Sequence, residues 1–196
     1  MFFPEDMTLQ YFLFDTYPGY LLQMVPIALA AWLLAFLHRR RSRGESLPRA
    51  AVAALFPAYL AALLALTLLA RFISDGWYIL LYHQMPWPEG EGGYRWLSLV
   101  YDFKLDFFRS LSGENLGNIL LFLPFGVLYP LGNPGASWRR TLLLGVGTSL
   151  TIELIQPLPD RSFDVNDLVL NSLGVALSTL FFYVVRSQWQ RIRKPA

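Results

Sequence analysis

Residues 153–171, ELIQPLPDRSFDVNDLVLN, join the end of one apolar segment to the start of the next. The rest of the chain predicts a membrane protein, because its 196 residues are 55% hydrophobic and only 15% charged, with a mean hydropathy of +0.39. Soluble domains average about 25% charged residues. A charge in the middle of a bilayer costs about 2.5–3.5 kcal/mol on insertion scales. The charged and amide residues of this stretch therefore indicate a site.

Five apolar windows predict an all-α membrane protein built as a five-helix transmembrane bundle. A crossing helix needs about 20 residues. We expect a single domain over residues 1–196, with an outer loop over about 71–112. The predicted spans are about 18–37, 51–70, 113–131, 138–156 and 167–185.

The basic residues predict the direction of the chain, because cytoplasmic loops carry an excess of Lys and Arg. The connections after the first and third spans, together with the tail, hold eleven of the 16 basic residues, including the run Arg39–Arg43. The amino terminus is therefore expected outside a bacterial cell membrane and the carboxyl terminus in the cytoplasm. The polar ends of the third, fourth and fifth spans would then all lie at the outer surface.

The second half of the outer loop predicts an amphipathic helix that lies in the membrane interface. Its apolar residues recur at helical spacing: Trp96, Leu99, Val100, Phe103, Phe107 and Leu111. A cap packed on the bundle is the alternative. The first half, from Trp77 to Tyr94, is rich in Pro and Gly and is expected to be irregular.

The candidate ligand-binding residues come from three spans and one connection, and they are Asn118, Glu153, Gln156, Arg161, Asp164, Asp167 and Asn171. Glu153 and Asp167 are also candidates for catalysis, as general acid or base. Asp164 and Asp167 are candidates for a divalent cation, for which Mg²⁺ or Ca²⁺ suits oxygen ligands better than Zn²⁺ does. No other cofactor is expected. The chain has no cysteine, which excludes disulfides and thiol chemistry.

Several of these residues also have a purely structural explanation. Asp164 precedes the fifth span and Asp167 follows three residues later, which resembles a capping box. Arg161 is expected to reach back to a carboxylate in forked geometry, either to build the site or only to neutralise the acids. In this reading the whole cluster serves to hold two helices together, and removing one partner would leave a costly buried charge.

Small and polar residues form stripes on the fourth and fifth spans, and such stripes allow helices to approach closely. We therefore expect these two faces to pack against each other. The stripes are Gly145, Ser149, Glu153 and Gln156 on the fourth span, and Asp164, Asp167, Asn171, Gly174 and Ser178 on the fifth.

The segments NILLFLPFG at 118–126, ELIQ at 153–156 and RSFDVNDLVLNSLG at 161–174 resemble the VanZ-like family of bacterial membrane proteins. Two positions depart from the pattern: Asp160 stands where a glycine often precedes the arginine, and Ser178 where a glycine often closes the pattern. The family is named for a component of glycopeptide-resistance clusters associated with teicoplanin. The resemblance therefore implies a link to the cell envelope and to lipid-bearing glycopeptides.

Two functions follow as expectations. The first is an outward-facing polar pocket that binds an amphiphilic cell-envelope molecule or a lipoglycopeptide, and that lowers sensitivity to teicoplanin-type antibiotics. The second is a membrane enzyme that acts on a lipid-linked envelope substrate by carboxylate acid/base or Mg-assisted chemistry. The expected partners are membrane lipid and a lipid-linked envelope precursor or lipoglycopeptide, and no nucleic acid.

Overall fold

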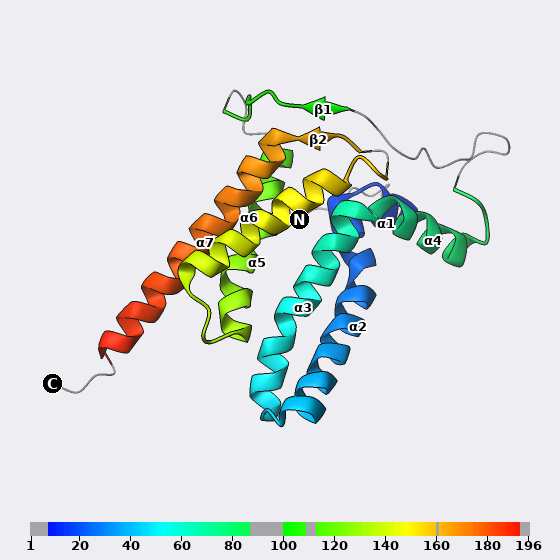
Figure 1. The fold of residues 1–196 in the computed structure, drawn as a ribbon. Helices are drawn as coiled ribbons and strands as arrows, with labels where there is room; N and C mark the ends of the chain where they lie inside the picture. Colours follow the sequence, from blue (N-terminus) through cyan, green and yellow to red (C-terminus); the bar gives the residue numbers. More distant parts are fainter. Residues whose placement is uncertain (1–7, 87–99, 109–112, 160, 193–196) are drawn as a thin grey trace.

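A computed structural model describes residues 8–86, 100–108, 113–159 and 161–192 (Figure 1). In these ranges the chain is all-α apart from two short strands, and long helices occupy the five predicted windows. The elements are α1 (Leu9–Phe14), α2 (Tyr17–Arg43), α3 (Leu47–Leu68), α4 (Ala70–Tyr82), β1 (Tyr101–Asp102), α5 (Gly113–Gly132), α6 (Trp138–Ile155), β2 (Phe163–Asp164) and α7 (Val165–Ile192).

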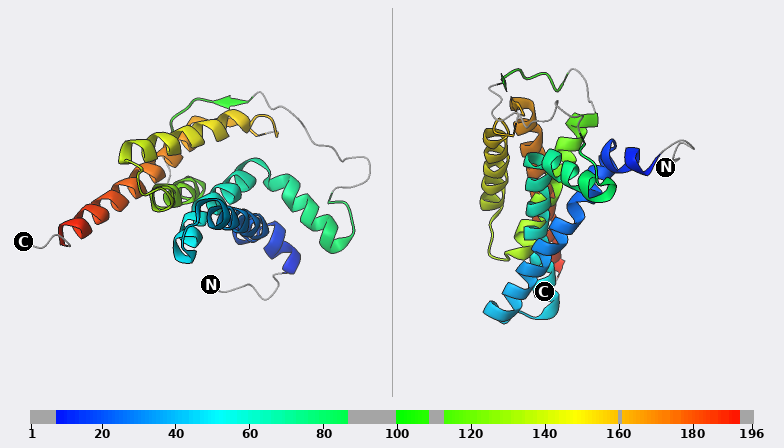
Figure 2. Two further views of the ribbon diagram at one scale, coloured as in Figure 1. Left: turned by 60° about the horizontal axis from the view of Figure 1, so that its bottom comes forward. Right: turned by 90° about the vertical axis from the view of Figure 1, so that its right-hand side faces the viewer.

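The helices form two groups that lie side by side (Figures 1 and 2). The first is the antiparallel pair α2 and α3, which a short connection joins at Gly44, where φ is +61°. Glycine suits this left-handed helix end because it has no Cβ. The second group is α5, α6 and α7, and α3 links the two groups by packing against α5.

Close approach within the second group depends on glycines. A Cβ at Gly145 of α6 would collide with the Val175 side chain of α7. A Cβ at Gly174 of α7 would lie 3.3 Å from Phe122 Cβ and closer still to the Ile119 carbonyl oxygen, both on α5. The predicted stripes therefore do not simply face each other, because the stripe on α7 is shared between α6 and α5.

Among the residues that the structure describes, four helices are long and apolar enough to cross a membrane, namely α2, α3, α5 and α7. The fourth predicted span, α6, is outside this set because it holds three charged residues, Arg139, Arg140 and Glu153. Its Glu153 is not presented to lipid, because α6 packs against α7 and α5 and the side chain is only 1% exposed.

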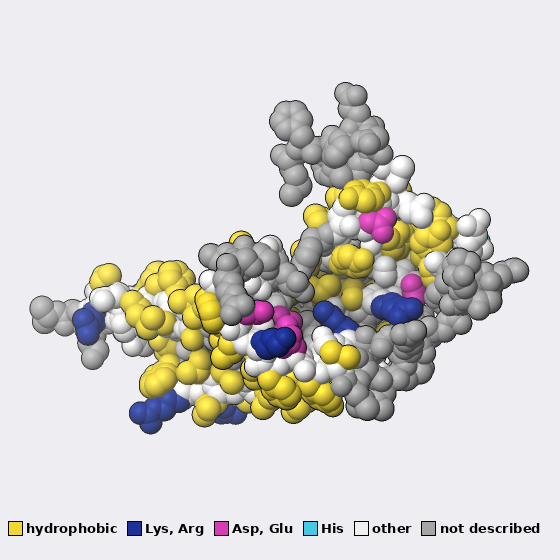
Figure 3. Space-filling model, turned by 90° about the horizontal axis from the view of Figure 1, so that it is seen from above, with side chains coloured by type: hydrophobic (Ala, Val, Ile, Leu, Met, Phe, Trp, Pro, Cys, Tyr) yellow, Lys and Arg dark blue, Asp and Glu magenta, His cyan; other side chains and the backbone are white. Residues whose placement is uncertain are grey.

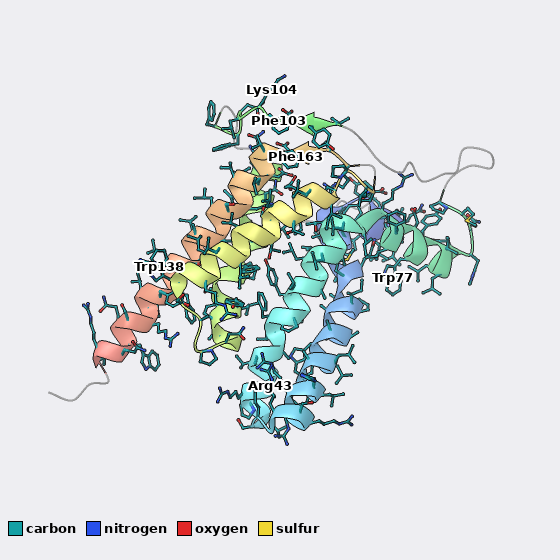
Figure 4. The ribbon with its side chains drawn as sticks, viewed as in Figure 1. Arg43, Trp77, Phe103, Lys104, Trp138 and Phe163 are labelled. Atoms are coloured by element: carbon teal, nitrogen blue, oxygen red, sulfur yellow. The ribbon has the colours of Figure 1, made fainter. Side chains whose placement is uncertain are left out.

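The two ends of the helices differ in charge. The end at which α2 joins α3 and α5 joins α6 carries the arginine run, and we call it the basic end. Arg43 lies at this end, whereas Phe103, Lys104 and Phe163 lie at the opposite end (Figure 4). The connection between α6 and α7 is at the opposite end too, so the polar stretch 153–171 lies far from the arginine run (Figure 1).

Two predictions for the outer loop are wrong where the structure describes it. Residues Ala70–Tyr82 form α4, although the part from Trp77 onward was predicted to be irregular. The helix predicted over 96–111 is not formed over 100–108, where β1 pairs in parallel with β2. Residues 96–99 and 109–111 of that predicted helix lie outside the described residues, as does Asp160.

The strand replaces the helix because its backbone groups find partners far away in the sequence. Phe163 N donates to Val100 O at 3.0 Å, and Tyr101 and Asp102 pair with Phe163 and Asp164. Backbone groups need a hydrogen-bond partner, and here the strand pairing supplies it. The helical spacing of the side chains therefore does not decide the local structure.

Candidate functional site

Glu153 and Gln156 lie at the last turn of α6, and both are buried. With its nitrogen turned toward the carboxylate, the Gln156 amide donates to Glu153 Oε2 at 2.9 Å. The backbone N–H of Asp164 donates to the same oxygen at 3.1 Å. The connection between α6 and α7 thus folds back over the Glu153 carboxylate, which provides the hydrogen bonds that a buried acid needs.

Asp164 caps helix α7. Its Oδ1 accepts from the backbone N–H of Asn166 at 2.7 Å, which is the bond expected of an N-cap side chain. This agrees with the capping explanation for Asp164. The residue does not line the cavity described below.

Two amide side chains of the candidate set come from α5 and α7. Asn118 donates through Nδ2 to Asp167 Oδ1, so that α5 and α7 are joined by a polar contact inside the bundle. Asn171, one turn further along α7, is 4% exposed, and its Oδ1 is buried without a hydrogen-bond partner among the described residues. An unsatisfied buried acceptor costs about 1–3 kcal/mol, so this atom calls for an explanation.

Arg161 differs from its predicted geometry. Its Nη1 donates to the backbone carbonyl of Thr67 at 3.0 Å, near the end of α3. Within the described residues its guanidinium forms no ion pair with a carboxylate, because the connection that carries it runs beside α3. Arg161 therefore ties the α6–α7 connection to the first group of helices.

These residues surround one cavity of about 500 Å³, a volume typical of ligand pockets. Six of the seven candidate ligand-binding residues line it, all except Asp164: Asn118, Glu153, Gln156, Arg161, Asp167 and Asn171. Glu153 and Asp167, on which the functional interpretation depends, therefore border the same space. Acidic and basic side chains lie next to each other on this end of the molecule (Figure 3).

The first group of helices, together with α4, provides a second wall of this cavity, and none of its residues is among the predicted site residues. It is built from Tyr20 of α2, Thr67 of α3, and Arg71, Ser74 and Asp75 of α4. Ser74 and Asp75 lie three and four residues after Arg71, which places all three on one face of α4. This spacing is visible in the sequence and is a signal for a helix face, although the composition of the segment favours a loop.

No group of three or more His, Cys, Asp or Glu in residues 8–86, 100–108, 113–159 and 161–192 is placed to hold a metal ion. The two acids predicted as cation ligands have other partners. Asp164 accepts from Asn166 N, and Asp167 accepts from Asn118.

A short extended segment, residues 100–108, lies over the start of α7. Asn166 holds it through a reciprocal pair of bonds, since its Nδ2 donates to Asp106 Oδ1 at 3.0 Å and its Oδ1 accepts from Asp106 N at 3.1 Å. Phe103 packs on Phe163 of β2 with ring centroids 5.6 Å apart (Figure 4). The segment thus secures the connection whose backbone binds Glu153.

A family model described as VanZ/LLP1 matches residues 25–186. No curated protein and no solved structure matches the chain. The matched range contains every candidate site residue and most of the cavity wall, from Thr67 to Asn171.

Proposed function

Since the chain belongs to the VanZ/LLP1 family, we propose that it is a bacterial membrane protein that binds an amphiphilic cell-envelope molecule in the cavity at the end opposite the basic end. The observation that carries this proposal is the meeting of polar side chains from α5, α6 and α7, Asn171 among them, around one space. Polar groups inside a membrane protein mark ligand or ion pathways by default.

The lining of the cavity favours a ligand with mixed polar chemistry. Arg71 and Arg161 suit phosphate or carboxylate groups, because guanidinium binds both in a forked geometry. Glu153 and Asp167 accept hydrogen bonds from hydroxyl or amine groups. A lipoglycopeptide, or a lipid-linked envelope precursor with sugar and acidic groups, meets both requirements.

The proposed topology has five crossings, with the amino terminus outside and the carboxyl terminus in the cytoplasm. The basic end, with its arginine run, then faces the cytoplasm as the distribution of basic residues requires. In this arrangement α6 is the fourth crossing, with Glu153 enclosed by protein. The amphipathic α4, which exposes Leu80 and Leu81 to its surroundings, lies in the outer interface.

The topology is tested with single cysteines, because the natural chain has none. Ser162→Cys and Ser42→Cys place thiols at exposed positions at opposite ends of the bundle. In intact cells a membrane-impermeant maleimide is expected to label the first and not the second, and permeabilised cells should label both. Labelling of Ser42→Cys from outside would overturn the orientation.

The binding function is tested by teicoplanin tolerance in cells that express the protein or lack it. Glu153→Ala and Arg161→Ala are expected to abolish any tolerance that the parent provides, because they remove groups that line the cavity. Arg43→Ala, an exposed change at the basic end, is the matched control and should retain it. Variants that reach the membrane at parental levels and keep parental tolerance would refute a role of this cavity in teicoplanin tolerance.

The alternative is an enzyme that acts on a lipid-linked envelope substrate. It is favoured by one observation: Glu153 is buried yet borders the cavity, a placement suited to a general acid or base. Incubating purified protein with a radiolabelled polyprenyl-linked precursor, with and without Mg²⁺, separates the two functions. Product that forms with the parent and is absent with Glu153→Gln would establish the enzyme. Precursor that stays bound to the protein without forming product supports binding alone.

A further inference from the structure

A second hollow, of about 420 Å³, lies between α2, α3 and α5, and we call it the groove. One face of each helix lines it at steps of three, one and three residues: Leu21, Met24, Val25 and Ala28 on α2; Tyr59, Ala62, Leu63 and Leu66 on α3; Gly117, Leu120, Leu121 and Pro124 on α5. These faces are almost entirely apolar. Tyr59 is no exception, because its hydroxyl donates to the Leu121 carbonyl at 2.8 Å and leaves its ring as the lining surface.

The groove is continuous with the polar cavity. Leu66 and Leu121 line both spaces, so the two hollows meet at these side chains. The helix α3 packs against both α2 and α5, whereas α2 and α5 have little direct contact with each other. The gap between them therefore borders a polar compartment at one end and runs along three helices that are long and apolar enough to span a membrane.

We propose that the groove receives the hydrocarbon chain of the same amphiphile whose polar group occupies the cavity, an inference that rests on the proposed function. A chain that leaves the bilayer for this groove gains little hydrophobic free energy, because lipid tails are as apolar as the side chains of the wall. The groove therefore acts by fixing the position of the chain. It selects ligands in which a hydrocarbon chain is joined directly to a polar group containing phosphate or carboxylate.

Lipid rather than another protein helix is the occupant that the surroundings favour. Leu21 and Val25 are 49% and 45% exposed at the edge of the groove, on the side where a spanning helix meets acyl chains. The groove continues into the cavity that Arg71 and Arg161 line, so an amphiphile can place its hydrocarbon chain in one and its polar group in the other. An apolar helix in the groove would make no use of the polar cavity.

The inference is tested by photo-cross-linking in phosphatidylcholine vesicles. The probe is phosphatidylglycerol with a diazirine in its acyl chain, and diacylglycerol with the same diazirine chain is the control that lacks phosphate. Mass spectrometry of the cross-linked peptides is expected to show several-fold enrichment at the groove faces of α2, α3 and α5 over the exposed residues Leu29 and Leu180. The diacylglycerol control should lack this enrichment.

Two substitutions on one helix form a matched pair. Ala28→Phe places a ring in the groove and is expected to remove the enrichment, whereas Ala30→Phe, exposed and outside the groove, should keep it. If Ala28→Phe does not purify as a monodisperse protein, Val25→Trp blocks the groove from its exposed edge. Even labelling around the bundle, or enrichment that persists when the groove is blocked, would overturn the inference and leave the polar cavity unaffected.

A cavity variant separates this inference from the function on which it rests. Arg161→Ala is expected to lower the labelling by phosphatidylglycerol toward that by diacylglycerol. If groove labelling is lost with Ala28→Phe but unchanged with Arg161→Ala, the chain binds independently of the cavity. That outcome would refute the proposal that one ligand occupies both the groove and the cavity. It would also refute the role of Arg161 in binding the polar group of that ligand.

Discussion

Helices α3 and α5 meet along one interface whose two halves differ. Toward the basic end, Phe56 of α3 packs on Phe125 and Tyr129 of α5, with ring centroids 5.1 and 5.2 Å apart. Toward the other end, the same two helices present Thr67 and Asn118 to the 500 Å³ cavity. Phe122 lies at the boundary, because it belongs to the buried core and also lines the cavity.

The difference shows how one helix pair provides both stability and a site. Large rings fill the space between two helices and exclude everything else, as close-packed interiors do. Short polar side chains leave that space open. The hydrogen-bonding groups there then need either an internal partner, as Asn118 has in Asp167 and the Thr67 carbonyl has in Arg161, or a ligand.

The largest expected effect on stability comes from removing a ring from the aromatic half of the α3–α5 interface, near the basic end. Phe125→Ala removes a ring that is 1% exposed and should lower the free energy of unfolding by about 3–5 kcal/mol. The measurement is an SDS titration of detergent-solubilised protein followed by circular dichroism. Phe181→Ala, on an exposed face of α7, is the control and should cost far less. Equal losses from the two variants would contradict the contrast between the halves.

An intermediate effect on stability is expected at the Glu153 carboxylate, which borders the cavity. Glu153→Ala leaves Asp164 N without its acceptor and should lower the free energy of unfolding by about 1–3 kcal/mol. Glu153→Gln keeps an oxygen for this N–H and should remain closer to the parent in the same titration. If Glu153→Gln fails to fold, the carboxylate serves chiefly to hold α6 and α7 together, as the structural hypothesis states.

The smallest effect on stability is expected at Asn171. Asn171→Leu removes a buried acceptor that has no partner, so the free energy of unfolding should change by less than about 1 kcal/mol or rise slightly. Phosphatidylglycerol cross-linking should nevertheless fall, because the side chain borders the cavity. Asn166→Ala provides the contrast, since it breaks the bonds to Asp106 and should cost stability. A large loss of stability in Asn171→Leu would show that this amide has a structural role.

Much of the arrangement was predictable, and the residues show why. The run of apolar residues from Pro18 to Leu37 predicts a helix because only a helix satisfies its own backbone in lipid. The placement of Glu153, Gln156 and Asn171 on helices that end or begin at the same surface followed from counting crossings. The prediction for the outer loop was wrong, because composition and local spacing do not indicate the α4 and β1 that form there.

The sequence by itself determined the apolar helices, the separation of the run Arg39–Arg43 from residues 153–171, and the family to which the chain belongs. Only the tertiary structure decided that α4 closes the cavity with Arg71 and Asp75, and that β1 pairs with a strand some sixty residues away. The physical reason is the range of the forces involved. Hydropathy and helical periodicity are patterns among residues close together in the sequence, whereas a cavity wall or a strand pair depends on which distant segments meet.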